Sequence, residues 1–176
     1  MRTYQRLRID GACYFFTVNL AEREGNILLI QHIEPLREAF RRTRQDHPFE
    51  IDAIVILPEH LNCIWQLPPD DSDYSTRWRL IKARFSMAIP KTERISKSRI
   101  RKSESGIWQR RYWEHAIRDQ RDYQNHVDYI HYNPVKHGHA KAARDWPYSS
   151  FHLWLKRGYY HADWCAPLNI AGSSWE

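Results

Sequence analysis

The sequence predicts an α+β fold in which helices pack against an antiparallel sheet of four to five strands. Segments rich in aromatic and β-branched residues alternate with segments whose apolar residues recur at helical spacing. Their order is strand, helix, strand, strand, helix, strand, helix, which is close to the ferredoxin-like plan. The 176 residues, 42% of them hydrophobic, suffice for one well-buried core.

The first half of the chain accounts for three strands and one helix. The segment "CYFFTVNL" at 13–20 has the composition of a strand, and further strands are expected at 49–58 and 61–68. The short interval between the last two indicates a β-hairpin. A helix is expected over 33–47, and Pro48 would end it.

The second half continues the same alternation. A helix is expected over 73–89, and "IWQRRYWEHAI" at 107–117 resumes strand-like character. The basic segment 90–106 between them has no periodicity, so we expect a flexible loop. The pattern is clearest for a helix over 118–133.

The boundaries of that last helix and of the domain follow from single residues. Asp119 can cap the helix, and Pro134 is expected to close it. One domain is expected over residues 1–140, and residues 141–176 are expected to form an irregular C-terminal extension of the same domain, with a short helix near "SSFHLWLKRG".

The charge balance favours a polyanionic partner. The formal net charge is +6 and the sequence pI is about 9.3, which suits nucleic acid first and an acidic membrane surface second. Three widely spaced cysteines indicate neither a disulfide framework nor a CxxC metal site. The sequence contains no signal-peptide pattern and no apolar run long enough for a membrane span, so a cytoplasmic location is expected.

The helix over 118–133 has a polar row beside its core stripe. At roughly 100° per residue, Tyr123, Val127 and Ile130 fall together, and Tyr132 lies opposite them. The polar row between them consists of Asp122, His126, Tyr129 and Asn133. Active-site helices have such rows, and so do many surface helices. Among the three tyrosines, Tyr129 alone shares a polar face with another potential metal ligand.

A second polar pair lies in the expected strand "LPEHLNCIWQLP" at 57–68. Because side chains alternate across a strand, His60 and Asn62 should project from the same face. Such a pair could hold a metal ion, or it could be an ordinary polar edge.

Three segments together resemble one protein family. "LPEHLNCIW", "WQRRYWEHAIRD" and "HVDYIHYNPVKHG" are similar to the REP-associated tyrosine transposases, a branch of the single-tyrosine HUH transposases. The resemblance extends from about Arg2 to Tyr160. It implies a ferredoxin-like sheet of the RNA-recognition-motif (RRM-like) type and, as substrate, single-stranded DNA whose repetitive extragenic palindromes fold as hairpins.

The resemblance also implies a set of site residues. The family motif is His-hydrophobic-His, and here it reads His60-Leu61-Asn62. The family's nucleophilic tyrosine falls on Tyr129, and Asn133, one helical turn later, would complete the site of a divalent metal, Mg²⁺ or Mn²⁺. The implied reaction is strand cleavage and joining through a 5′-phosphotyrosine intermediate.

The asparagine at position 62 leaves three interpretations open. His60, Asn62 and Asn133 could bind metal with a preference shifted toward Mg²⁺, because an amide oxygen is a weaker ligand than imidazole for Mn²⁺. His126 or His137 could substitute as a ligand. Alternatively, the protein could be a catalytically impaired module that binds hairpin or single-stranded DNA. An RNA-binding domain is a further alternative if aromatic residues line an open face of the sheet.

Basic residues outside the motif are candidates for contacts with DNA phosphates. They lie in the N-terminal arm, in the 90–106 loop and just after the last helix. The candidates are Arg2, Arg6, Arg8, Lys97, Arg99, Arg101, Lys102 and Lys136. The sequence leaves open whether the protein acts as a monomer or a homodimer.

Overall fold

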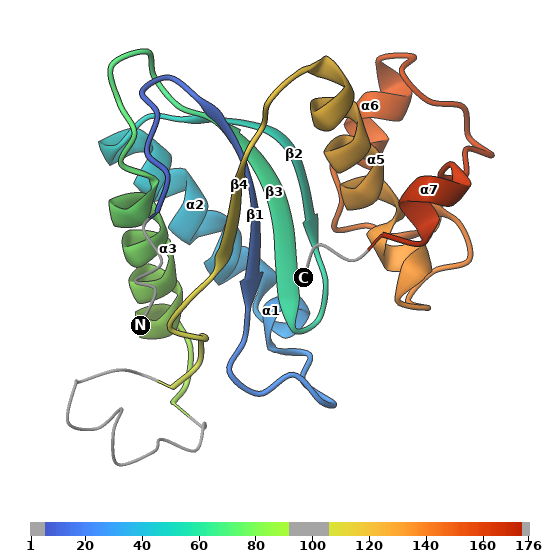
Figure 1. The fold of residues 1–176 in the computed structure, drawn as a ribbon. Helices are drawn as coiled ribbons and strands as arrows, with labels where there is room; N and C mark the ends of the chain where they lie inside the picture. Colours follow the sequence, from blue (N-terminus) through green and yellow to red (C-terminus); the bar gives the residue numbers. More distant parts are fainter. Residues whose placement is uncertain (1–5, 92–105, 174–176) are drawn as a thin grey trace, which may run out of the picture.

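A four-stranded antiparallel sheet forms the centre of the computed structural model, which describes residues 6–91 and 106–173 (Figure 1). The strands are β1 (Cys13–Asn19), β2 (Glu50–Ile56), β3 (His60–Gln66) and β4 (Trp113–Ala116). Their spatial order is β2-β3-β1-β4, with every neighbouring pair antiparallel. This is the order of a ferredoxin-like sheet, so the predicted fold is confirmed.

Two helices cover one face of the sheet. They are α2 (Ile33–Asp46), which follows the single turn α1 (Leu28–Gln31), and α3 (Tyr74–Ala88). Large aromatic residues fill the space between these helices and the strands: Trp65 of β3 stacks on Trp78 of α3 at 4.3 Å between ring centroids, and Phe49 lies 4.2 Å from Trp65. Such rings bury large apolar areas, so they account for much of the stability of this layer.

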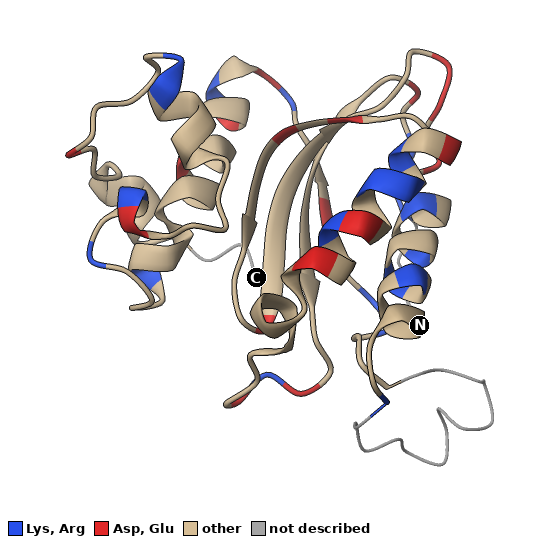
Figure 2. Cartoon of the chain, turned by 180° about the vertical axis from the view of Figure 1, so that it is seen from behind, with Lys and Arg blue, Asp and Glu red and all other residues tan. Residues whose placement is uncertain are grey.

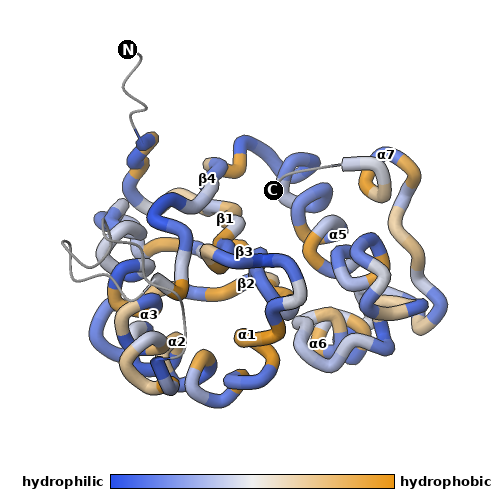
Figure 3. The backbone as a smooth tube through the Cα atoms, turned by 90° about the horizontal axis from the view of Figure 1, so that it is seen from below, coloured by the Kyte–Doolittle hydropathy of each residue, from blue (hydrophilic) through white to orange (hydrophobic). Residues whose placement is uncertain are grey.

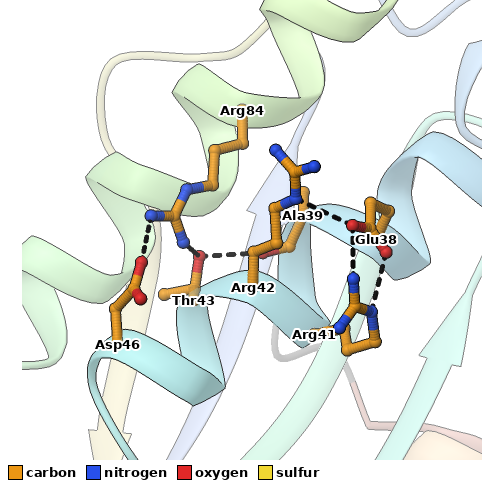
Figure 4. A network of polar contacts seen from close by, with 7 residues as sticks. All are labelled: Glu38, Ala39, Arg41, Arg42, Thr43, Asp46 and Arg84. Carbon is orange, nitrogen blue, oxygen red and sulfur yellow. Dashed lines mark hydrogen bonds and ion pairs between the residues drawn. The ribbon is translucent and has the colours of Figure 1, made fainter.

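Polar contacts join α2 and α3 on their outer surface. Figure 4 shows Arg84 of α3 donating to Thr43 and Asp46 of α2, while Glu38 accepts hydrogen bonds from two arginines of its own helix. Figure 2 shows that charged residues of both signs cover these two helices, whereas most of the strand residues are uncharged. Exposed pairs of this kind each contribute only about 0–1 kcal/mol.

The other face of the sheet is covered by α5 (Gln120–Lys136) and by the segment that follows it (Figures 1 and 3). Val127 and Ile130 of α5 pack on Phe15 of β1, and all three are fully buried. The C-terminal segment is more regular than expected. It contains the 3₁₀ turn η1 (Ala143–Asp145) and the helices α6 (Phe151–Lys156) and α7 (Leu168–Ala171), which pack in the same cluster.

The end of α5 differs from the prediction. Pro134 lies inside the helix, which continues to Lys136. The helix stops at Gly138, whose φ of +72° is a left-handed conformation that glycine adopts at little cost. The amides of Gly138 and His139 donate to the carbonyls of Val135 and Pro134, the pattern of a Schellman motif. One additional turn of helix therefore carries Lys136.

Two further differences concern the edges of the sheet. Within the segment 107–117, where a strand is expected, regular pairing with β1 covers Trp113–Ala116. Trp108 forms an isolated bridge with Leu20, and the exposed Arg110 and Arg111 lie between the two pairings. At the opposite edge, the backbone of residues 148–150 pairs with β2. Ile56 N donates to Tyr148 O at 2.9 Å, and Ser150 N donates to Ile54 O at 2.8 Å.

Within the described residues, none of the helices combines the length and apolar character needed to cross a bilayer.

Candidate active site

His60 and Asn62 project from β3 toward α5. The strand register pairs Asn62 with Thr17 and His60 with Asn19, and residues paired in this way point to the same face. The next residue on that face, Ile64, packs in the cluster that contains α5. Both His60 and Asn62 are fully buried. The expectation that they share a face is confirmed, and the face is interior rather than a solvent-exposed polar edge.

The preceding residue, Glu59, fixes the orientation of the His60 ring. Its Oε1 lies 2.9 Å from His60 Nδ1 and accepts a hydrogen bond from Arg23 at 3.2 Å. Burial alone would raise the pKa of the Glu59 carboxyl, but its hydrogen bonds with His60 and Arg23 lower it to about 2. A carboxylate at Nδ1 keeps the proton on that nitrogen, so Nε2 carries the lone pair that a metal ion requires.

Several buried polar atoms of β3 and α5 have no hydrogen-bond partner among the described residues. They are Nε2 of His60, Oδ1 of Asn62, and both amide atoms of Asn133. The amide of Asn62 donates to Thr17 Oγ1 at 2.7 Å, which leaves its oxygen as the ligand atom. Each such buried group costs about 1–3 kcal/mol if it stays unsatisfied. One imidazole nitrogen and two amide oxygens are a donor set that fits a divalent cation.

Tyr129 lies on the side of α5 that faces the sheet. It is 1% exposed, and its ring centroid is 6.1 Å from that of Phe15. Lys136 Nζ donates to Tyr129 Oη at 3.3 Å and lies 4.8 Å from the centre of its ring. Lys136 also donates to the carbonyl of Ser173 at 2.6 Å, which brings the C-terminal segment beside this tyrosine. A cation therefore lies next to the phenolic oxygen.

The other two tyrosines of α5 have different surroundings. Tyr123 is half-buried, and its hydroxyl donates to Asp52 Oδ2 at 3.2 Å. Burial, followed by the negative charge of Asp52, raises the pKa of Tyr123. Tyr132 is half-buried and packs against the C-terminal segment. The polar row is buried rather than at the surface: Asp122, His126 and Asn133 are each less than 9% exposed.

The two histidines considered as substitute ligands lie in different places. The ring of His137, directly after α5, is 5.1 Å from that of His60 between centroids. His126 packs 4.7 Å from Phe15 and stacks on His115 of β4 at 4.8 Å. The structure thus brings His137 to His60, and it places His126 in a separate polar cluster.

The three candidate DNA-binding residues that the structure describes, Arg6, Arg8 and Lys136, do not lie on one surface. Arg6 lies over the ring of Tyr112 at 4.0 Å and 3.9 Å from the buried Glu114, while Arg8 donates to Ser75 at the start of α3. Both lie on the side of the sheet that α2 and α3 cover, opposite Lys136. The remaining candidates lie outside the described residues: Arg2, Lys97, Arg99, Arg101 and Lys102.

Three residues of the site were not found from the sequence. Glu59 orients His60, Thr17 holds Asn62, and Asn19 is paired with His60. A signal for two of them was present, because Thr17 and Asn19 are the alternate polar positions of an otherwise apolar strand. Two aromatic residues of the strands lie on this face: Phe15 is buried, and Trp113 of β4 is 38% exposed. Because α5 covers this face, the sheet offers no open platform on which RNA bases could stack.

Comparison with known proteins identifies the family. No family model matches the chain. A REP-associated tyrosine transposase of Escherichia coli (strain K12) is 48% identical over 168 residues, which cover 96% of this chain and 93% of that protein. A protein of Haemophilus influenzae described by the same family name is 46% identical over 165 residues and 93% of each chain.

The fold agrees with a solved structure of the same kind. A REP-associated tyrosine transposase bound to a REP hairpin superposes with a TM-score of 0.83 at 46% identity, covering 96% of this chain and 93% of that one. The sequence similarity and the shared fold both extend over nearly the whole length of each protein. The chain therefore belongs to the REP-associated tyrosine transposases.

Proposed function

We propose that this protein cleaves and rejoins single-stranded DNA beside a palindromic hairpin, with Tyr129 as the nucleophile. The observation that carries the proposal is that His60 and Asn62 face α5, the helix that carries Tyr129, Asn133 and Lys136, and that the ring of His137 at the end of α5 lies 5.1 Å from that of His60. A related protein is known bound to a REP hairpin, which supports hairpin DNA as the partner.

Lys136 would make Tyr129 a better nucleophile. Its ammonium group donates to the phenolic oxygen at 3.3 Å, and a positive charge at that distance favours the phenolate. Tyr129 Oη would attack the scissile phosphorus, forming a 5′-phosphotyrosine bond, while the bond to the 3′ oxygen breaks and that oxygen leaves as a hydroxyl. The phosphoester bond is retained in the intermediate, so rejoining requires no nucleotide cofactor. Because Tyr129 is 1% exposed, the side chains above it must move when the strand enters.

His60, Asn62 and Asn133 would hold a divalent ion, Mg²⁺ or Mn²⁺, and His137, whose ring lies 5.1 Å from that of His60, would add a second imidazole. When bound, the ion neutralises charge on the scissile phosphate and polarises its oxygens. The protein contributes the fixed orientation: Glu59 holds His60 at Nδ1, and Thr17 holds Asn62 through its amide.

Covalent capture on a labelled single strand tests the proposal. Tyr129→Phe should abolish the protein–DNA adduct and change hairpin affinity by no more than a few-fold, because only the hydroxyl is removed. Tyr132→Phe is the matched control from the same helix and should retain the adduct. Adduct formation by Tyr129→Phe, or its loss in Tyr132→Phe alone, would reject the assignment.

The alternative function is a hairpin-binding protein that has lost cleavage. Asn62 favours it, because the position that carries a histidine in the family motif is occupied here by a neutral amide already bonded to Thr17. The same capture experiment separates the two. A wild-type protein that binds the hairpin with Mg²⁺ or Mn²⁺ present but forms no adduct would support the binding function.

A further inference from the structure

A cluster of three potential metal ligands lies between β4 and the first half of α5. His115 comes from β4, and Asp122 and His126 lie one turn apart on α5. One ligand atom from each lies within 4.8 Å of the other two. The Nε2 atom of His115 is 2.8 Å from Asp122 Oδ2, and His126 Nδ1 is 3.2 Å from Asp122 Oδ1. None of these residues takes part in the site at His60.

The protonation states suit a metal ion. His126 Nδ1 lies 2.8 Å from the carbonyl oxygen of Asp122, which can only accept, so Nδ1 carries the proton and Nε2 the lone pair. Metal-binding histidines are commonly held in this way by a backbone carbonyl.

We propose that His115, Asp122 and His126 bind a divalent transition-metal ion of the Zn²⁺ class, at a site separate from the one at His60. Two imidazoles and one carboxylate are a common ligand set for such ions and leave a fourth position for water. In a tetrahedral site, ligand atoms are about 3.4 Å apart for bonds of about 2.1 Å. The three ligand atoms lie within 4.8 Å of one another, so rotations of the side chains would bring them to this spacing.

The position of the cluster suggests what the ion does. Asp122 precedes Asn133 by eleven residues, so the two ends of the polar row are roughly 16 Å apart along the helix. The phenolic oxygen of Tyr129 is directed toward Lys136 at the far end. An ion at the cluster would tie β4 to the first turns of α5, and so hold the helix that carries Tyr129 against the sheet. Its role is positional.

Arg118 competes for the carboxylate through two groups, and its backbone amide donates to Asp122 Oδ2 at 3.0 Å. Arg118 Nε lies 3.3 Å from Asp122 Oδ2, but the side chain of Arg118 is 75% exposed and can turn toward solvent. His115 is 24% exposed, which gives an ion a route to the cluster. Because His115 Nε2 donates to Asp122, metal binding at this nitrogen requires the ring proton to move to Nδ1.

Titration of the full-length, chelator-treated protein with Co²⁺ and Zn²⁺ tests the inference. His60→Ala removes the other site, so it should retain one Co²⁺ per chain, with visible absorption typical of nitrogen and oxygen ligands. His115→Ala and Asp122→Asn, in the same background, should each weaken this Co²⁺ by at least tenfold. Arg118→Ala should strengthen it.

Two results would overturn the inference. The first is a His60→Ala protein that folds, judged by circular dichroism, and binds no Co²⁺. The second is Co²⁺ affinity unchanged by His115→Ala and Asp122→Asn, which would make the cluster a hydrogen-bonded ion pair only. Because the readout is metal binding, neither result depends on whether Tyr129 cleaves DNA.

Discussion

Replacing Asn62 by histidine tests the candidate metal site directly, because it restores a second imidazole on β3. The substitution has a structural cost. Asn62 is fully buried and donates to Thr17 at 2.7 Å. Losing that hydrogen bond costs about 1 kcal/mol. Fitting the larger ring adds about 1–3 kcal/mol. The free energy of unfolding without metal should therefore fall by about 2–4 kcal/mol, and Tm by roughly 5–15 °C for a chain of this size.

Mn²⁺ should offset most of this loss in the variant. An imidazole in place of an amide oxygen should raise Mn²⁺ affinity by at least about tenfold, equivalent to about 1.4 kcal/mol. At a Mn²⁺ concentration 100 times the variant's Kd, binding adds about 2.7 kcal/mol to the free energy of unfolding, compared with about 1.4 kcal/mol for the wild type under the same conditions. The Tm gain should be about 5–11 °C in Asn62→His and about 3–6 °C in the wild type.

Thermal unfolding in EDTA, Mg²⁺ and Mn²⁺ gives the measurement, together with Mn²⁺-supported cleavage. His60→Ala combined with Asn62→His is the control, because any Mn²⁺ shift that survives in it reports binding elsewhere, including at His115. The gain should be smaller with Mg²⁺, which prefers oxygen ligands. If Mn²⁺ raises the Tm of Asn62→His no more than that of the double variant, this strand face binds no metal and the reasoning fails.

Three further predictions concern other parts of the chain. Asp122→Asn should have a lower free energy of unfolding than the wild type at neutral pH. The difference, measured by urea unfolding, should shrink as pH falls from about 4 to 2, because the pKa of Asp122 is lowered from 3.8 to about 2 in the folded protein. A constant difference would contradict this. Gly138→Ala should cost about 1 kcal/mol in free energy of unfolding, since Gly138 has φ of +72°. Gly172→Ala, at φ −89°, is the control and should cost less than half as much. Each lost phosphate contact should reduce the slope of log K against log salt by about 0.7–0.9. Replacing Lys97, Arg99, Arg101 and Lys102 together by neutral residues should therefore reduce this slope for hairpin binding. An unchanged slope would exclude phosphate contacts by these residues.

The order of strands and helices could be predicted because it depends on local periodicity. The alternation around His60 and Asn62 and the helical spacing of Tyr129 and Asn133 are properties of short segments, and both are confirmed as shared faces. The prediction that Pro134 ends the helix is wrong. The helix tolerates this proline because it stops only four residues later, at Gly138.

What could not be predicted depends on contacts between distant segments. The strand register that pairs His60 with Asn19 and the position of His137 beside His60 require the assembled sheet and helix. His131 is another example. A histidine in a basic protein suggests the surface, but this one is fully buried and lies within hydrogen-bonding distance of Tyr160 and Ser150, residues of the C-terminal segment.

The backbone pairing of residues 148–150 with β2 protects the protein against aggregation. An edge strand with free amides and carbonyls is a template for pairing with a second chain, and β2 is rich in β-branched residues that favour such pairing. The C-terminal segment of the same chain occupies the edge of β2, and the next residue along that segment, Phe151, is buried. A chain shortened to residue 140 should therefore aggregate through β2, whereas the full-length protein presents an edge that is already paired.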